Sequence, residues 1–595
     1  MKIPSFIFLL SQLLPLWALA QPNGYRSIHQ EENEKFKKMG NMSRGDYDSL
    51  RGFIPVFYDL PNKNSILSRK VFGYHPYWGG SNYLNYQWNL LSDFCYFSYE
   101  VDPNTGGPLT IHEWETSPAI DSAIANGVKV HLCITLFSSH GTFFNNPDAE
   151  QNLINTAIDL VQARQANGIN LDFEAMPSAY GSSFTEFVAD LHDQIQLINP
   201  NLEISIAAPA VNWSNTFDIP ALGYFLDFFM VMCYDYYWNG SSQAGPVSPL
   251  YSMVGFYDYN FSKTISYYQS QGIDPAKLVV GVPYYARQWP TEGQYAPSAT
   301  TGTGVAYTYS YIRNNNSGYY SPENKIREPN SFAPYFAFFN DQWTQCFVDD
   351  IYSMGKKFDL VNRRNLGGIG IWALGYDIGY PDFWNLIWSK FTSGNGIVSA
   401  DTIYDSGGPA FDYYNDENYF YTLTTAENSQ IHLAFSQLNI EAGYDSLLIF
   451  DGPDNQFPLI GVFSGDTVPL NFIASGHQLT LEFKSDAGIT ASGWRAVYDT
   501  IPVSSIKAYK KSPVFGIYPN PVKNEVKIYI SLQLSQLKDL KLLILNAKGQ
   551  KMKEIDFFTE DRIISIDVSS WPAGIYIANL IMNGNKTDQS KFIVK

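Results

Sequence analysis

The sequence predicts a multidomain protein: a (β/α)8 TIM barrel with a small α+β insertion, then an antiparallel β-sandwich and a small C-terminal β-sandwich. Strand-like apolar runs alternate with helical patterns from Lys70 to about residue 390, which is typical of a barrel of parallel strands. Helical patterning fades after residue 400, where short β-like runs and turns take over. A chain of 595 residues is also too long for one domain of ~100–250 residues.

The N-terminus has the features of a secretory signal peptide over residues 1–20. Lys2 supplies a short basic region, Ile3–Leu19 is mostly apolar, and Ala18-Leu19-Ala20 matches an A-x-A cleavage site. A membrane anchor is the alternative, but Pro15 and polar residues interrupt the apolar run. Later segments fall short of ~20 apolar residues, so we expect no membrane span in the mature protein.

Residues 21–66 are polar, contain Pro55 and Pro61, and are expected to form an irregular leader ahead of the first domain. The net charge of −18 argues against nucleic acid or an anionic membrane surface as a partner. The four cysteines show no metal-ligand spacing. We expect them to be small buried hydrophobic residues, with one disulfide as the alternative.

The barrel is expected over residues 67–395. Its predicted strands are Val71–Tyr74, Phe94–Tyr99, Val128–Leu136, Ile169–Phe173, Glu203–Ala208, Phe225–Tyr234, Leu278–Tyr284 and Gly368–Trp372. Between the fourth and fifth of these, Ser183 and Glu186 form a capping-box pattern that predicts a helix start. Residues 290–341 are too long for a simple loop and predict the inserted subdomain, in which Val305–Tyr311 alternates like a strand.

The fourth strand carries the most informative side chains. Because side chains alternate along a strand, Asn170, Asp172 and Glu174 share one face. A solvated face is the alternative, but the apolar residues between them are typical of a buried strand. Asp172 and Glu174 would lie about 7 Å apart at the backbone. One of them can protonate a leaving oxygen, but the nucleophile must come from elsewhere, such as the carbonyl of a 2-acetamido sugar.

The predicted strands change in style beyond the barrel. Residues 400–502 predict a sandwich and residues 514–595 a second all-β unit, joined by a Ser- and Lys-rich linker over 503–513. The expected strands are Tyr419–Leu423, Ile431–Phe435, Ser446–Phe450, Gln478–Phe483, Arg495–Tyr498, Val526–Ile530, Leu540–Leu545, Ile563–Val568 and Ile575–Leu580.

The barrel resembles glycoside hydrolase family 18, the chitinase family, over roughly residues 68–392. Asn167-Gly168-Ile169-Asn170-Leu171-Asp172-Phe173-Glu174 matches the last two acidic positions of the family's D-x-x-D-x-D-x-E. The form G-x-N-x-D-F-E resembles members that include cell-wall N-acetylglucosaminidases. Met232-Cys233-Tyr234-Asp235 matches M-x-Y-D, Gly281–Arg287 is close to G-x-P-x-Y-G-R, and Gly367–Trp372 carries the family's strand-eight Trp. The family's S-x-G-G appears only as Ser138-Ser139-His140-Gly141.

The resemblance implies a role for each matched residue. Glu174 would be the general acid and then the base, and Asp172 would orient the acetamido group and stabilise the oxazolinium intermediate. Tyr234 would bond the acetamido oxygen, with Asp235 supporting it. The implied substrate-binding residues are Trp372, Tyr285, Arg287, Tyr74, Asn170 and Met232. Barrel packing is the alternative role for these flanking residues. No cofactor is implied for catalysis.

The middle unit resembles a CUB domain. The residues that carry the likeness include Phe435, Tyr444–Leu447, Asp451-Gly452 and Gly493-Trp494. Calcium-binding CUB domains place carboxylates at positions that match Glu441, Asp445 and Asp486, and hard oxygen ligands suit Ca²⁺. The usual disulfide cysteines are missing, so turn-capping or solvated acids are the alternative to a calcium site. The implied role is binding carbohydrate or protein.

The C-terminal unit resembles the sorting domain of the type IX secretion system of Bacteroidetes. It begins with Tyr518-Pro519-Asn520-Pro521, continues with Ala573-Gly574-Ile575-Tyr576 and ends with Lys591–Lys595. A small β-sandwich binding module is the alternative. The resemblance implies export through the periplasm, with the type IX machinery as a partner and a secreted or cell-surface destination.

Together these features predict a monomeric, secreted glycosidase that cleaves β-1,4-linked N-acetylglucosamine glycans, most simply chitin, by substrate-assisted retaining catalysis. A peptidoglycan N-acetylglucosaminidase and an endo-β-N-acetylglucosaminidase acting on N-glycans stay open as alternatives. A non-catalytic glycan-binding protein on the same scaffold is the alternative from another class.

Overall fold

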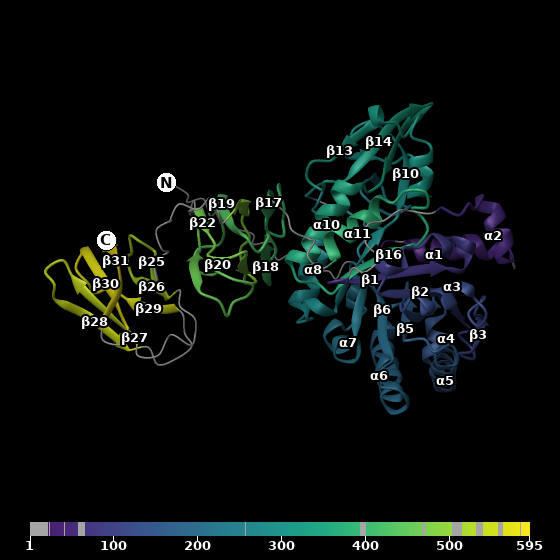
Figure 1. The fold of residues 1–595 in the computed structure, drawn as a ribbon, viewed down its shortest axis with the longest axis horizontal. Helices are drawn as coiled ribbons and strands as arrows, with labels where there is room; N and C mark the ends of the chain where they lie inside the picture. Colours follow the sequence, from purple (N-terminus) through teal and green to yellow (C-terminus); the bar gives the residue numbers. More distant parts are fainter. Residues whose placement is uncertain are drawn as a thin grey trace, which may run out of the picture.

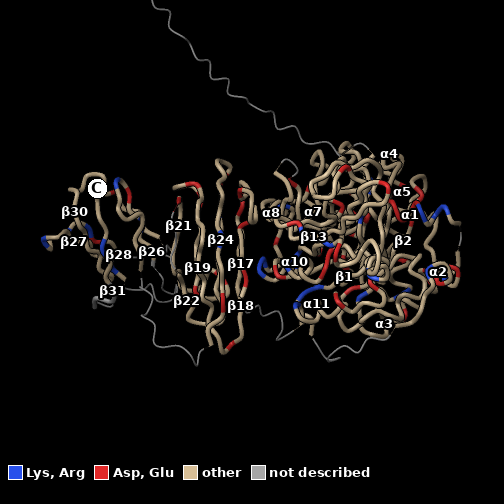
Figure 2. The backbone as a smooth tube through the Cα atoms, turned by 90° about the horizontal axis from the view of Figure 1, so that it is seen from above, with Lys and Arg blue, Asp and Glu red and all other residues tan. Residues whose placement is uncertain are grey.

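The protein forms three units in a row: a barrel, a β-sandwich and a small C-terminal β unit (Figures 1 and 2). The structure is a computed structural model that describes residues 22, 24–40, 42–56, 66–255, 258–392, 400–466, 471–502, 515–530, 540–556, 563–582 and 585–595. The expected signal peptide (1–20) and linker (503–513) lie outside the described residues.

A closed barrel of eight parallel strands fills residues 66–392 as far as they are described. The strands are β1 (Lys70–Pro76), β2 (Asp93–Val101), β4 (Lys129–Leu136), β5 (Gly168–Phe173), β6 (Glu203–Pro209), β7 (Phe228–Met232), β9 (Leu278–Pro283) and β16 (Gly368–Trp372). β1 pairs with β16 on one side and with β2 on the other, which closes the ring. The predicted fold class and every predicted barrel strand are confirmed.

Helices surround the barrel and bury apolar stripes against it. They are α3 (Pro118–Ala125), α4 (His140–Phe144), α5 (Pro147–Ala163), α6 (Gly181–Ile198), α7 (Ile219–Phe225), α8 (Phe261–Ser270), α10 (Ile351–Arg363) and α11 (Asp382–Phe391). The start predicted for α6 from Ser183 is wrong. A short turn over Ser178–Tyr180 runs directly into the helix at Gly181, so Ser183 lies inside the first turn and caps nothing.

The insertion is a five-stranded sheet that rises beside the barrel (Figure 1). Its strands are β10 (Tyr285–Thr291), β12 (Val305–Thr308), β13 (Lys325–Arg327), β14 (Pro334–Asn340) and β15 (Gln342–Phe347), with α9 (Tyr309–Asn314) between them. The sheet extends beyond the predicted range of 290–341 at both ends, because its central strands begin and end within the apolar runs that border the barrel. The predicted strand over Val305–Tyr311 stops at Thr308, whose hydroxyl caps α9.

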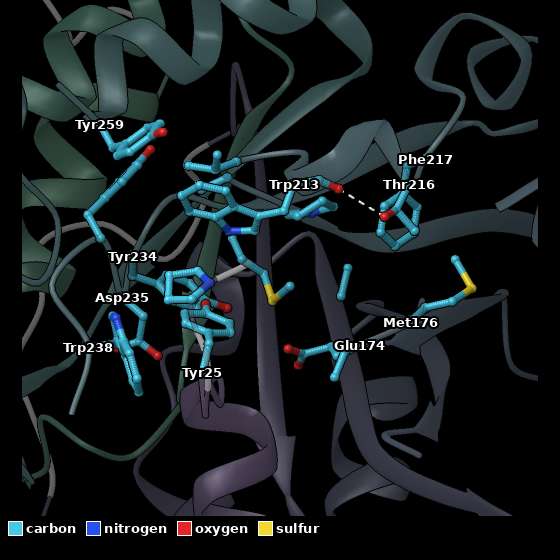
Figure 3. Close-up of a pocket in the computed structure, with 18 of the residues that line it drawn as sticks. Tyr25, Glu174, Met176, Trp213, Thr216, Phe217, Tyr234, Asp235, Trp238 and Tyr259 are labelled. Atoms are coloured by element: carbon cyan, nitrogen blue, oxygen red, sulfur yellow. Dashed lines mark hydrogen bonds between the residues drawn. The ribbon is translucent and has the colours of Figure 1, made fainter. Parts of the chain in front are cut away.

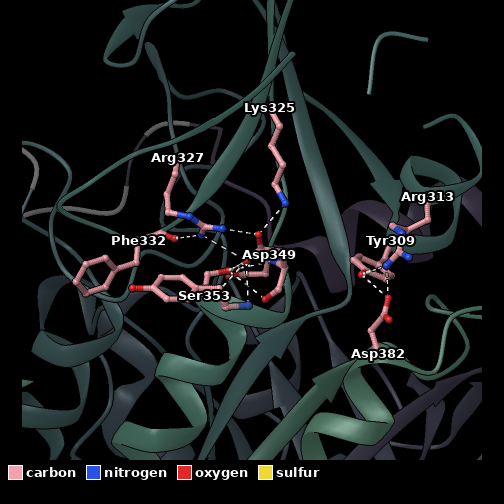
Figure 4. A network of polar contacts seen from close by, with 10 residues as sticks. Tyr309, Arg313, Lys325, Arg327, Phe332, Asp349, Ser353 and Asp382 are labelled. Carbon is pink, nitrogen blue, oxygen red and sulfur yellow. Dashed lines mark hydrogen bonds and ion pairs between the residues drawn. The ribbon is translucent and has the colours of Figure 1, made fainter. Parts of the chain in front are cut away.

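Ion pairs fix the insertion to the barrel helices (Figure 4). Lys325 and Arg327 of β13 both reach Asp350, the residue that caps α10, at 2.7 and 2.6 Å. Arg313 of α9 pairs with Asp382 at the start of α11. The sheet therefore stands as a fixed wall over the carboxyl ends of the barrel strands.

Two four-stranded antiparallel sheets form the middle unit. One contains β17 (Ala400–Tyr404), β24 (Gly493–Pro502), β19 (Ser429–Asn439) and β22 (Asn471–Ile473). The other contains β18 (Asn418–Thr424), β23 (Gln478–Lys484), β20 (Ser446–Phe450) and β21 (Leu459–Phe463). All the predicted strands are present, and the sandwich architecture is confirmed.

The middle unit packs directly on the barrel through β18, which contacts α8 and α10. Arg363 at the end of α10 donates to Asp401 at 2.8 Å and to the hydroxyl groups of Tyr421 and Tyr498. The guanidinium group of Arg364 lies 3.1 Å from the ring centre of Tyr419. The two units share one continuous apolar core.

The C-terminal unit is built from β25 (Phe515–Tyr518), β26 (Glu525–Ile530) and β29 (Ile563–Asp567) in one sheet. The other sheet contains β28 (Lys551–Asp556), β27 (Leu540–Asn546), β30 (Gly574–Met582) and β31 (Asn585–Val594). Its core forms a cluster of its own, and Tyr518, Tyr529 and Ile563 at its edge pack against Phe450, Leu459 and Val462 of the middle unit. The predicted all-β character is confirmed.

The leader is not irregular, which corrects the sequence-based expectation. It forms α1 (Ile28–Lys37) and α2 (Arg44–Arg51), and α1 crosses the barrel beside β1 and β16 (Figure 1). Ser27 caps α1 by accepting from the N–H of Gln30, and Ser43 caps α2 through a capping box with Asp46. Both caps are visible in the sequence, but the apolar residues of the helices are too few to predict them.

All four cysteines, Cys95, Cys133, Cys233 and Cys346, are buried free thiols. They fill core positions as small hydrophobic residues, and the alternative of a disulfide is not realised. Among the described residues, no helix is both long and apolar enough to cross a membrane.

Candidate active site

Two buried carboxyl groups mark the carboxyl end of β5. Asp172 is the second-last residue of the strand, and Glu174 directly follows the end of the strand. Both are almost fully buried, at 0% and 7% exposure. They lie close enough to share a hydrogen bond, and no N–H or hydroxyl of the described residues donates to Oδ1 of Asp172.

Burial sets the charge of this pair. Burial raises the pKa of Asp172 to about 8, and the hydrogen bond to Glu174 acts to lower this pKa. The pKa of Glu174 lies well above its ordinary value, first because of burial and then because of the negative charge of Asp172. Burial therefore favours the protonated form of Glu174, which is the form that a general acid needs.

Tyr234 and Asp235 extend the site from the end of β7. Asp235 has a positive φ of 55°, which turns its carboxylate into the barrel mouth. Its Oδ1 accepts from the hydroxyl of Tyr285 at 2.7 Å and from the guanidinium of Arg287 at 3.0 Å. Tyr285 and Arg287 thus come together with the predicted catalytic residues, and both fix the orientation of Asp235.

Trp372 ends β16 and is the aromatic floor of the site. It is completely buried, and the rings of Phe97 and Tyr74 support it with centroids 5.1 and 5.4 Å away. Its indole N–H is directed toward the barrel mouth, where it donates to Glu32 of the leader at 3.0 Å.

Two predicted substrate-binding residues lie one layer deeper. The hydroxyl of Tyr74 donates to Oδ1 of Asn170 at 2.8 Å, and Nδ2 of Asn170 donates to Ser205 at 2.9 Å. Both side chains are fully buried, and their hydrogen bonds are formed with other side chains inside the barrel. Asn170 is therefore placed to support Asp172 from below, while Met232 lines the open cleft next to Tyr234.

An open cleft of about 770 Å³, adjoining solvent included, is lined by Glu174, Tyr234 and Asp235 (Figure 3). Many of its other lining side chains are aromatic. The aromatic lining residues are Tyr25, Phe173, Trp213, Phe217, Tyr234, Tyr236, Trp238 and Tyr259. Flat aromatic faces of this kind suit the apolar faces of sugar rings.

Sequence reasoning missed three residues of the site, all from the leader. The hydroxyl of Ser27 donates to Oε1 of Glu174 at 2.7 Å, and the backbone N–H of Ile28 donates to Asp235 at 2.7 Å. His29 lies deeper, between Asp172 and Tyr234, and is completely buried. The one available signal was the cap pattern of Ser27 and Gln30, which predicts a helix start but not its location.

The acidic residues predicted to bind calcium come together in the middle unit. Carboxylate oxygens of Glu441, Asp445 and Asp486 lie within 4.8 Å of one another. Asp445 is buried and already accepts from the N–H of Asp486 at 3.0 Å and from the hydroxyl of Tyr413. An all-oxygen donor set fits Ca²⁺, which would take these three carboxylates as ligands.

Three family models match the chain in succession. Residues 70–377 match the glycosyl hydrolases of family 18, residues 393–498 the CUB domain, and residues 516–595 the secretion system C-terminal sorting domain. The first match covers more than half of the chain.

Relatives with curated names match the barrel. YdhD of Bacillus subtilis, named as a sporulation-specific glycosylase, is 27% identical over 295 residues, which are 48% of this chain and 66% of YdhD. "Probable chitinase 10" of Drosophila melanogaster is 25% identical over 277 residues, 42% of this chain and 12% of that protein. The chain thus spans less than two thirds of either relative. Human cubilin matches the middle unit, with 33% identity over 112 residues, 18% of this chain and 3% of cubilin.

Solved structures of chitinases are similar to the barrel. The immunomodulatory active chitinase of Trichuris suis is 20% identical with a TM-score of 0.49, covering 54% of this chain and 98% of the other. The Group IV chitinase of Ostrinia furnacalis is 19% identical with a TM-score of 0.48 and the same coverage.

Proposed function

Since the chain belongs to the glycosyl hydrolases of family 18 and is a glycosidase, we propose that it cleaves β-1,4 linkages in polymers of N-acetylglucosamine, chitin first among them. The observation that carries this proposal is the carboxyl pair at the end of β5. Carboxyl oxygens of Asp172 and Glu174 lie within 4.8 Å of each other, so the two groups do not flank a scissile bond from opposite faces. Two-carboxylate glycosidases keep these groups roughly 5–10 Å apart across the bond.

The nucleophile then has to come from the substrate. In the proposed reaction the sugar stacks on Trp372, and the carbonyl oxygen of its acetamido group attacks the anomeric carbon from below. Asp172 accepts from the acetamido N–H and Tyr234 donates to the carbonyl oxygen. Glu174 passes its proton to the leaving oxygen and then takes a proton from the water that opens the oxazolinium ring, which retains configuration.

The open cleft supports the direction of binding. Glu174 lines this cleft together with the aromatic walls, whereas Trp372 is not among the lining residues. The leaving sugars would occupy the side of Trp213, Trp238 and Tyr259, where rings rather than charges provide the contacts. Such walls suit a neutral glycan chain and fit the acidic net charge of −18.

Peptidoglycan is the second substrate that an observation favours. YdhD, named as a sporulation-specific glycosylase, matches 48% of this chain, and the cortical fragment-lytic enzyme of Bacillus anthracis matches 51% at 20% identity. Chitin and the peptidoglycan backbone share β-1,4-linked N-acetylglucosamine, so the same carboxyl pair would serve both.

The test compares hydrolysis of chitin oligomers, peptidoglycan and N-glycopeptides by the wild type, Glu174→Gln and Glu186→Gln, each freed of the leader residues that contact the carboxyl pair. Glu186 is an exposed acid on α6 and serves as the matched control. Glu174→Gln is expected to lose about 10²–10⁴-fold in kcat while Glu186→Gln keeps the wild-type rate. Proton NMR of the first product is expected to show the β-anomer. Undiminished hydrolysis by Glu174→Gln refutes the catalytic assignment, and a leader-free wild type that is inactive on every acetamido glycan favours the glycan-binding alternative.

The C-terminal unit supports export as part of the proposal. A match to the secretion system C-terminal sorting domain over residues 516–595 implies secretion or display at the cell surface. We expect this unit to act as a secretion signal that is cleaved off after export. Deleting residues 516–595 is expected to retain the enzyme inside the producing cell, which fractionation and immunoblotting would detect.

A further inference from the structure

The first turn of α1 fills the space above Trp372. The imidazole ring of His29 stacks on the indole with centroids 3.6 Å apart and planes inclined by 24°. This is the position in which the proposed mechanism places the sugar ring. His29 is completely buried there, and Tyr74 and Phe97 close the space at its edges.

The hydrogen bonds of His29 reproduce those of an acetamido group. Nδ1 lies 2.8 Å from Oδ2 of Asp172, and Nε2 lies 2.7 Å from the hydroxyl of Tyr234. With Asp172 accepting, Nδ1 carries the proton and Nε2 accepts from Tyr234. A neutral imidazole thus offers Asp172 an N–H and offers Tyr234 an acceptor, the same pair of groups that an acetamido N–H and carbonyl oxygen present.

Ser27, two residues before His29, contacts the proposed acid of the same site. The hydroxyl of Ser27 donates to Glu174, at the place where the leaving oxygen would meet the acid. Burial lowers the pKa of His29 to about 4, although the charges of Glu174 and Asp235 act to raise it. The ring is therefore neutral near pH 7. In the neutral form one ring nitrogen donates and the other accepts, which matches the N–H and carbonyl oxygen of an acetamido group.

Contacts along α1 hold this turn in place. Glu31 pairs with Arg287 of β10 at 2.9 Å. Glu32 accepts from the indole N–H of Trp372 at 3.0 Å and from the hydroxyl of Tyr376 at 2.7 Å. Arg287 and Trp372 are two of the residues predicted to bind the substrate.

The far end of the leader is anchored as well. Phe36 stacks on Trp78 with centroids 4.8 Å apart, and Lys37 pairs with Glu100 at 2.7 Å. Asp48 of α2 accepts from the backbone N–H and the hydroxyl of Ser81 at 2.7 and 2.6 Å. The leader is therefore held from its first helical turn to its last, and a sugar cannot reach Trp372 while it is bound.

We propose that residues 22–56 are an autoinhibitory segment whose Ser27-Ile28-His29 turn occupies the sugar site as an internal mimic of the substrate. Hydrolysis requires this segment to leave. The identity of the blocked site rests on the proposed function, whereas the occupation of the site by the leader is a separate claim.

The first experiment uses the full chain with a recognition sequence for a site-specific protease placed between Val56 and Ile66. Hydrolysis of a fluorogenic N-acetylglucosamine oligomer is measured before cleavage and after cleavage and dialysis. Release of the leader is expected to raise kcat/KM at least 10-fold. The wild type treated with the same protease controls for cleavage elsewhere. Equal rates before and after verified release overturn the proposal.

The second experiment leaves the chain intact and changes single residues. His29→Ala is expected to raise the rate of the uncut enzyme, and Lys38→Ala, an exposed residue of the same segment, is expected to leave it unchanged. A gain in rate cannot come from misfolding. A synthetic peptide of residues 22–56 is expected to inhibit the cleaved enzyme competitively, and the same peptide with His29→Ala to inhibit at least 10-fold more weakly. Equal inhibition by the two peptides contradicts the mimicry.

The two proposals can fail separately. If the cleaved enzyme hydrolyses no acetamido glycan, the proposed function fails. The leader is then judged by calorimetric binding of the peptide to the cleaved protein. Tight binding that depends on His29 and on Asp172 keeps the leader in this site, and absence of binding overturns it.

Discussion

At the scale of single residues, the row along β5 divides into two layers. Asp172 and Glu174 meet at the barrel mouth, while Asn170 lies beneath them between Tyr74 and Ser205. An uncharged amide at this depth donates and accepts without adding charge. The alternation of a strand predicts that the three side chains share a face, but not that the lowest is sealed from the substrate, because depth depends on how the barrel closes.

Asn170→Asp would place a second negative charge beside Asp172. Like charges raise the pKa of a carboxyl group, so Glu174 would keep its proton to higher pH. In the leader-free enzyme, we expect the basic limb of the pH–rate profile to move up by about 0.5–1 unit while turnover persists. Asn170→Ala, which changes shape without charge, is the control. A profile identical to that of the wild type contradicts this expectation.

Glu32 links the leader to pH. Burial raises its pKa from an ordinary 4.5 to about 7, although the donors Tyr376 and Trp372 and the charges of Arg51 and Lys35 act to lower it. The bound carboxyl therefore holds its proton more tightly than the carboxyl of a released leader. The contribution of Glu32 to leader binding is therefore fully present below pH 4.5. This contribution is lost as the pH rises through about 7.

The substitution Glu32→Gln should remove this dependence. Its amide oxygen can accept the same two hydrogen bonds and carries no proton to lose. We expect the uncut Glu32→Gln enzyme to be several-fold less active than the uncut wild type at pH 8 and equal to it at pH 4.5. Rates are expressed relative to the cleaved form of each protein, which cancels the titration of the catalytic groups. A constant ratio from pH 4.5 to 8 argues against a role for Glu32.

At the scale of elements, one aromatic contact holds the far end of α1. Phe36 is 6% exposed and stacks on Trp78. Truncating a buried Phe costs about 3–5 kcal/mol when the cavity does not collapse. We expect Phe36→Ala to raise the rate of the uncut enzyme about 10-fold or more, and Met39→Ala, which is 44% exposed, to have little effect. Both are measured on the intact chain with a fluorogenic oligomer.

The elements that the sequence predicts well are those with long, regular apolar patterns. Every barrel strand belongs to this group, because strands buried on both faces are nearly continuous apolar runs. The start of α6 was misplaced because a short turn over Ser178–Tyr180 leads into the helix before Ser183. The two leader helices were missed because α1 has few apolar residues, and its burial comes from polar contacts such as those of His29 and Glu31.

At the scale of the whole molecule, the barrel and the middle unit behave as one body. Arg363 reaches three partners in the middle unit, and one apolar core runs through both. Motifs in the sequence predict each unit but not this contact, because Arg363 carries no signal that separates an interface from a solvated helix end. The face of β18 that packs on α8 and α10 is not available to a ligand.

The acidic cluster of the middle unit offers a test by metal removal. If Ca²⁺ binds at Glu441, Asp445 and Asp486, chelation should leave three carboxylates to repel one another. We expect EDTA to lower the melting temperature of the wild type by several degrees and calcium to restore it. Asp445→Asn should melt lower and respond to neither addition. A melting temperature that is independent of EDTA would indicate that these acids are solvated or cap turns and do not bind calcium.

The leader is joined to the barrel it blocks: it is described as far as Val56, and β1 begins at Lys70. A tether of this length holds the turn near the site at an effective concentration in the millimolar range. A peptide with a dissociation constant of about 10 μM would then suppress an attached enzyme about 100-fold, yet would do little to a detached one at nanomolar concentration. Severing the tether once would therefore convert a strong block into a negligible one by dilution alone, and the change would not reverse.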